Sequence, residues 1–195
     1  VLLDKSFKIT GFQKINEENI FTELHEFQYL DDDTIIQIGS KSHKYDNQNV
    51  DSGIISIINQ KNGTNFIWDS IDHVSPDSSN VPMKEWGMKS NDYFHMNAVR
   101  ILSDGNYLAS ARHTQTIMKI DKLSGEIIWH MGKGSLNNFK FINDPYNGFS
   151  HQHAPEELDN KNILIWDNGI GSIEYGSRVC EYQIDENKLT ATLVW

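Results

Sequence analysis

The chain has 195 residues, which is long enough for one domain with a hydrophobic core. Its composition, 38% hydrophobic and 23% charged, is typical of a globular domain and excludes a largely disordered chain. The formal net charge of −10 argues against nucleic acid as a partner, and no apolar run reaches the ~18 residues that a membrane-spanning helix needs.

Three successive segments of the chain share one pattern. Each contains four short runs of β-type residues, separated by polar turns, and each ends on a tryptophan. The segments run from His25 to Trp68, from His95 to Trp129 and from His153 to Trp195. No segment keeps an apolar period of 3.6 residues, so the sequence predicts an all-β fold.

Four-stranded units that repeat every ~40–50 residues favour a β-propeller over the alternative, a β-sandwich built from the same hairpins. A propeller closes with at least four blades. The three units and the strand-like start of the chain therefore predict that residues 1–195 form part of one propeller domain, of which they supply about three to four blades.

The middle unit opens with a hairpin whose far end is unusually polar. Asp104-Gly105 predicts a two-residue turn, which would place Arg112 directly opposite Asn97. His95 lies two residues from Asn97 and therefore on the same face. The three side chains are expected to meet at the end of the hairpin away from its turn.

The other two units carry polar residues at the equivalent places. Counted from the turns, His25 and His153 correspond to Asn97, His151 corresponds to His95, and Ser40 and Asn168 correspond to Arg112. Equivalent positions of a propeller converge on its axis. We therefore expect one polar pocket rather than isolated structural histidines, with these residues around it: His25, His95, Asn97, Arg112 and His153.

The remaining histidines and the cysteine give weaker signals. His73 lies in a long connection and either caps the pocket or braces the loop, while His43, His113 and His130 are interpreted as surface or turn residues. Cys180 lies in a strand-like run, where a buried, inert thiol is expected. Converging histidines can bind Zn²⁺, but the sequence has no short-range metal spacing, so no metal ligands are predicted.

Nearly the whole chain carries motifs of one known family, in the family's order. They include "HEFQ" (25–28), "YFHMNAV" (93–99), "DGNYLASARHT" (104–114), "FSHQH" (149–153), "WDNG" (166–169) and "SRVCEYQID" (177–185). This pattern resembles the aryl-sulfate sulfotransferases that work without a nucleotide sulfate donor. The resemblance implies a six-bladed propeller with the active site on its channel rim, no cofactor, and an extracytoplasmic location.

The resemblance also implies a reaction. A sulfuryl group passes from a phenolic sulfate ester to a phenol through a sulfurylated histidine, which here is His153. His25, His95, Asn97 and Arg112 resemble the groups that hold the sulfuryl oxygens, with Asn168, His151 and His73 as further substrate-binding candidates. The expected partners are small phenols and aryl sulfates. The alternatives are a propeller that only binds ligands and a metal-dependent hydrolase on the same fold.

The chemistry suits these residue types. A neutral imidazole can attack sulfur and form a covalent intermediate. The guanidinium of Arg112 can donate to two sulfate oxygens at once, which an ammonium cannot. Either His25 or His95 can protonate the leaving phenol oxygen and later accept the proton of the acceptor, and the sequence does not distinguish between them.

Overall fold

The structure is a computed structural model that describes residues 2–11, 15, 18–81, 91–170 and 176–195. The described residues form strands, turns and two short 3₁₀ helices, η1 (Ser70–Asp72) and η2 (Pro76–Ser78). No helix in the described part of the chain has the length and apolar character required to span a bilayer.

The strands form three blades, each built from four consecutive antiparallel strands. The first blade contains β3 (Ile20–Tyr29), β4 (Thr34–Tyr45), β5 (Gln48–Asn59) and β6 (Gly63–Asp69). The second contains β8 (Met96–Ile101), β9 (Tyr107–Ala111), β10 (Thr116–Ile120) and β11 (Ile127–Gly132). The third contains β13 (His153–Glu157), β14 (Ile163–Asp167), β15 (Arg178–Asp185) and β16 (Thr190–Leu193).

Four shorter strands complete the described structure. β1 (Leu2–Leu3) and β2 (Ile9–Gly11) pair with each other near the start of the chain. β7 (Asn91–Asp92) joins the first blade as a parallel partner of β5, and β12 (Lys140–Ile142) joins the third blade as a parallel partner of β16. The residues of β7, which shortly precede the second blade, are thus fixed to the first blade.

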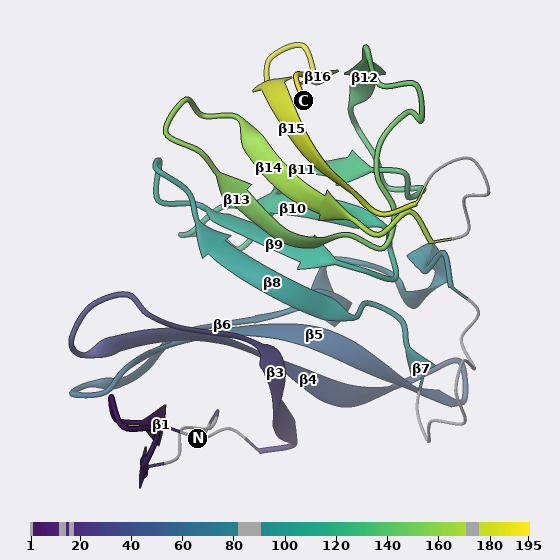
Figure 1. The fold of residues 1–195 in the computed structure, drawn as a ribbon. Coiled ribbons are helices and arrows are strands. Elements are labelled where there is room, and N and C mark those ends of the chain that lie inside the picture. Colours follow the sequence, from purple (N-terminus) through teal and green to yellow (C-terminus); the bar gives the residue numbers. More distant parts are fainter. Residues whose placement is uncertain (1, 12–14, 16–17, 82–90, 171–175) are drawn as a thin grey trace.

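The blades stack face to face in chain order (Figure 1). The first strand of the second blade, β8, contacts β3 and β4 on one side and β13 on the other. Side chains alternate along β9, so that Tyr107 and Ala109 pack toward the first blade while Leu108 packs toward the third. Each blade interface therefore has its own hydrophobic core, and the predicted all-β, propeller-type architecture is confirmed.

The two cores explain which residues hold the blades together. Between the first and second blades, buried isoleucines of β4 and β5 meet Trp68, Phe94, Val99 and Met118. Between the second and third blades, Ile117 and Trp129 meet Phe149, Ile165 and Tyr182. Complete burial of one such side chain contributes roughly 1.5–3 kcal/mol, so the packed faces are the main source of stability.

The predicted register of the β8–β9 hairpin is wrong. Asn106 O accepts from Leu102 N and Leu102 O accepts from Gly105 N, so the turn has a three-residue loop, with Gly105 at a φ of +86°. A longer loop shifts the pairing by one residue. The register shifts again between Met96 and Ala98, so that Arg112 N donates to His95 O and Arg112 is not opposite Asn97.

Two histidines are less exposed than the sequence suggested. His43 lies in β4, where its Nε2 is 3.0 Å from both Ser52 Oγ and Asp69 Oδ2, and His130 lies in β11. Their interpretation as surface or turn residues is therefore wrong, because each side chain points into a packed part of its blade. Cys180 is buried as predicted, and burial raises the pKa of its thiol to about 11.

Burial of His130 makes the stability of the fold depend on pH. Burial lowers the pKa of His130 to about 4, whereas an unfolded histidine titrates near ~6.5. Between these two values the unfolded chain binds a proton that the folded chain does not, so the free energy of unfolding falls as the pH falls from about 6.5 to 4. His130→Gln should lose less stability over this interval, as measured by urea unfolding at several pH values. An unchanged pH dependence would contradict this account.

Candidate active site

The first strand of each of the three described blades has an interrupted register. The pairing shifts between Thr22 and Phe27 in β3, between Met96 and Ala98 in β8, and between His153 and Glu156 in β13. Such bulges redirect side chains and recur beside active sites. Two of the predicted site residues, His25 and Asn97, lie inside these bulges, and His153 borders the third.

Three histidines, one from each blade, meet at this place. The ring centre of His25 lies 5.5 Å from that of His95 and 6.2 Å from that of His153. Arg112 is close enough for its positive charge to lower the pKa of His153. Among the described residues, no ion pair or side-chain hydrogen bond is made by Arg112. The histidine cluster, defined as His25, His95 and His153, thus has an adjacent cation that no carboxylate in the described part of the chain pairs with.

The imidazole of His153 is held at one of its two nitrogens. Its Nδ1 lies 3.0 Å from Asn168 Nδ2 and 3.2 Å from the carbonyl oxygen of His151. The amide of Asn168 has a defined orientation, because the indole of Trp166 can only donate and lies 2.8 Å from Asn168 Oδ1. Asn168 Nδ2 also donates to His151 O at 2.7 Å. No described residue forms a hydrogen bond with Nε2 of His153, so Nε2 keeps a free lone pair when Nδ1 donates its hydrogen to the His151 carbonyl.

The surroundings of His153 favour its neutral form. Burial is the main cause that lowers its pKa below the usual range; the hydrogen bond to the His151 carbonyl acts in the opposite direction. The positive charges of His25, Arg112 and His95 lower the pKa further. At neutral pH the ring is therefore an uncharged imidazole, the form that can act as a nucleophile.

Asn97 and Gln152 connect the second blade to the segment that carries His153. Asn97 is 4% exposed, and its Nδ2 donates to the carbonyl oxygen of Gln152 at 2.8 Å. The fully buried amide of Gln152 lies 2.8–3.1 Å from three oxygens, which belong to Ser110, Ala111 and Thr116. The contacts observed for Asn97 are thus positioning contacts, and its contact with substrate stays a prediction. The sequence analysis did not identify Gln152. The available signal was the alternation in "HQH", which directs Gln152 away from the two histidines.

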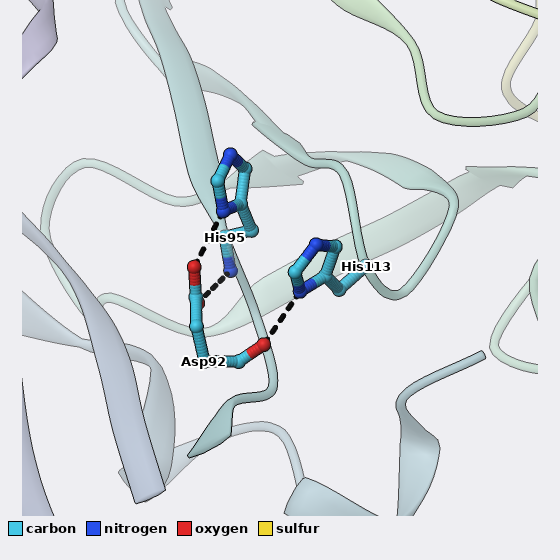
Figure 2. A group of neighbouring side chains, drawn as sticks. All are labelled: Asp92, His95 and His113. Atoms are coloured by element: carbon cyan, nitrogen blue, oxygen red, sulfur yellow. Dashed lines mark hydrogen bonds and ion pairs between the residues drawn. The ribbon is translucent and has the colours of Figure 1, made fainter. Parts of the chain in front are cut away.

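His95 is held by two residues that the sequence analysis did not assign to the site, Asp92 and His113 (Figure 2). Asp92 Oδ2 lies 2.5 Å from His95 Nδ1, and Asp92 Oδ1 accepts from the His95 backbone N–H at 2.8 Å. The ring of His113 stacks on that of His95, with centres 4.5 Å apart, and its Nδ1 lies 2.5 Å from the backbone oxygen of Asp92. The spacing of three residues in "DYFH" was the available signal.

In the described part of the chain, Asp92, His95 and His113 together form a group that could bind a metal ion. One ligand atom from each of Asp92, His95 and His113 lies within 4.8 Å of the others. The observed geometry is that of a hydrogen-bonded group, since both Nδ1 atoms already face oxygens of Asp92. Burial favours a higher pKa for Asp92, but the hydrogen bond and the charge of His95, with the charge of His113, lower the pKa overall. Asp92 is therefore an ionised acceptor.

The other predicted residues lie at different distances from the histidine cluster. His25 is exposed, and its Nδ1 is 3.8 Å from Glu23 Oε2, which is too long for a hydrogen bond. His151 is buried and presents its backbone carbonyl to Asn168. His73 follows η1 and stacks on Trp68 with ring centres 5.1 Å apart; no described contact joins it to the cluster. Its place in substrate binding stays a prediction.

A small cavity lies beside His25 and His95, between the first two blades. Its volume is about 30 Å³, and Glu23, Ser52 and Asp92 help to line it. This space is sufficient for about one water molecule and not for an aromatic ring. An aryl ligand must therefore approach the histidines from outside this cavity.

One family model matches nearly the whole chain. The family model described as Arylsulfotransferase (ASST) matches residues 6–195, which includes all three blades and every residue of the histidine cluster. The comparison with curated proteins finds no match for this chain. Because the family match spans nearly the whole sequence, the chain belongs to the arylsulfotransferase (ASST) family.

Proposed function

We propose that the protein transfers a sulfuryl group from an aryl sulfate to a phenol in two displacements, with His153 as the nucleophile. The observation that carries this proposal is the half-buried, neutral imidazole of His153 near the guanidinium of Arg112, which makes no ion pair with any residue that the structure describes. A sulfate ester carries one negative charge, which the guanidinium can bind through two parallel hydrogen bonds.

In the first displacement, Nε2 of His153 attacks sulfur as the bond from sulfur to the aryl oxygen breaks. Either His25 or His95 donates a proton to the departing aryl oxygen, so the products are a phenol and a sulfurylated, positively charged imidazole. The carbonyl oxygen of His151, 3.2 Å from Nδ1, stabilises this charge. In the second displacement, the oxygen of the acceptor phenol attacks the same sulfur, its O–H proton returns to the histidine that protonated the first phenol, and His153 leaves as a neutral imidazole.

Arg112 stabilises the transition state of both steps. Charge develops on the sulfuryl oxygens while sulfur is transferred, and a fixed donor lowers the barrier when it faces that charge in a site with little water. Nδ1–H of His153 donates to the carbonyl of His151, and Asn168 Nδ2 donates to the same carbonyl. Trp166 fixes the amide of Asn168, so the nucleophile does not have to be ordered during the reaction.

Steady-state kinetics of the complete protein with a chromogenic aryl sulfate and a phenol acceptor test this proposal. We expect release of the chromophore to be stimulated by the acceptor, with parallel double-reciprocal plots that indicate a ping-pong mechanism. A chelator should have no effect. Acceptor-independent release that a chelator abolishes would support a metal-dependent hydrolase instead, and no release from any aryl sulfate would support a binding module.

A further inference from the structure

The histidine cluster contains two carboxylate–histidine pairs with different geometry. In the first blade, Glu23 and His25 are 3.8 Å apart and both side chains are about 40% exposed. In the second blade, Asp92 and His95 are 2.5 Å apart and their side chains are 28% and 26% exposed. Each pair joins a carboxylate to Nδ1 of its histidine, so Nε2 is the nitrogen available to a ligand in both.

The pair in the second blade is fixed from several directions. β7 pairs in parallel with β5, which attaches Asp92 to the first blade next to Asp51. The two oxygens of the Asp92 carboxylate hold the ring and the backbone of His95, whose φ of +51° lies in the left-handed region. Non-glycine residues in this region are found at sites where the surrounding structure imposes the conformation.

His113 completes this arrangement. A backbone carbonyl only accepts, so Nδ1 of His113 must carry a hydrogen and donate to Asp92 O. Burial lowers the pKa of His113, so its imidazole is neutral at pH 7. This neutral ring stacks on the ring of His95. Figure 2 shows the second ring nitrogen of His95 on the side of the ring away from Asp92.

We propose that Asp92 is a positioning residue that keeps Nδ1 of His95 protonated and directs Nε2 toward the reacting phenol oxygen, so that His95 rather than His25 exchanges the proton. This inference rests on the proposed function. In the first displacement, the Nε2 proton of the His95 imidazolium passes to the departing aryl oxygen, while the Asp92 carboxylate stays ionised. In the second, the O–H proton of the acceptor phenol returns to Nε2 and its oxygen binds sulfur.

The titratable and charged groups around His95 come from all three blades. The acidic groups are Asp92 and Glu23, and the others are His25, His113, His153 and Arg112. Among the described acidic groups, Asp92 is the one that hydrogen-bonds the His95 ring. The carboxylate that determines which nitrogen of His95 is protonated is therefore that of Asp92.

The test compares Asp92→Asn with wild type on two donors. The 4-nitrophenolate of 4-nitrophenyl sulfate leaves without a proton, whereas phenyl sulfate needs general acid assistance. We expect Asp92→Asn to lower kcat on phenyl sulfate at least about 10-fold more than on 4-nitrophenyl sulfate, within the ~10²–10⁴-fold that general acid–base catalysis supplies. A merely structural role would slow both donors equally.

Three controls separate this inference from its alternatives. Glu23→Gln, the matched change in the loose pair, should alter the donor ratio less than about 3-fold, because a pair at 3.8 Å is not hydrogen-bonded. Asp92→Glu should restore part of the phenyl sulfate activity. Loss of wild-type activity with a chelator, and recovery with Zn²⁺, would overturn the positioning role in favour of metal binding.

A direct measurement does not depend on turnover. The imidazole ¹H–¹⁵N spectrum of the complete protein should contain a hydrogen-bonded Nδ1–H resonance of His95 that disappears in Asp92→Asn. If wild type is inactive on every aryl sulfate but this resonance behaves as expected, the proposed function fails while the Asp92–His95 contact holds. If wild type is active and Asp92→Asn slows both donors equally or retains the resonance, the inference itself is overturned.

Discussion

His153→Ala is expected to abolish release of phenol from an aryl sulfate, including release in the absence of an acceptor. The two displacements share His153 as the group that holds the sulfuryl unit, so neither can proceed without it. Removal of a covalent nucleophile costs on the order of 10⁴- to 10⁶-fold in kcat. Because His153 is half-buried at the start of β13, the truncation should leave the fold intact.

The intermediate can be identified directly. Protein quenched during turnover, without acid, should carry an SO₃ group on the peptide that contains His153, and addition of a phenol acceptor should remove it. His130→Gln serves as the matched control, since His130 is also a partly buried histidine but lies outside the histidine cluster, in β11. An SO₃ group on any other peptide, or full activity of His153→Ala, would exclude His153 as the nucleophile.

The parts of this site that could be predicted are those that follow from repetition. Counting from the turns made His25, Asn97 and His153 equivalent, and the bulges of β3, β8 and β13 occur at those positions. The assumed turn of the β8–β9 hairpin was one residue too short. This did not change the equivalence of the three positions, because each position was counted from the turn of its own blade. That residues 1–195 form part of a single larger ring stays a prediction.

The parts that could not be predicted depend on connections between blades. Asp92 reaches His95 because β7 pairs with β5, a parallel contact that joins residues about 40 positions apart in the chain. Gln152 acts across the blade interface on β9 and β10. Turn-based register describes hairpins within one blade, so it carries no information about such contacts. His113 was overlooked for the same reason, since its partner precedes the hairpin.

Arg112→Ala is expected to lower kcat/KM by about 2–4 kcal/mol of transition-state free energy, roughly 30- to 1,000-fold, if the guanidinium is the main donor to the sulfuryl oxygens. Arg112→Lys keeps the charge but loses the forked geometry, and its activity should lie between wild type and Arg112→Ala. If Arg112 were purely structural, Arg112→Ala would lower the free energy of unfolding and leave kcat/KM of the folded protein unchanged.

The pH dependence of kcat/KM gives a second, independent readout for Arg112. The reactive form of His153 is neutral, and burial together with the charge of Arg112 lowers the pKa of His153. The acid limb of the wild-type profile should therefore lie below pH ~6.5, the usual value for histidine. Removal of the positive charge in Arg112→Ala should raise the pKa of His153 and move this limb to higher pH, whereas Arg112→Lys should leave it nearly unchanged. An acid limb at the same pH in all three proteins would show that Arg112 does not act on His153.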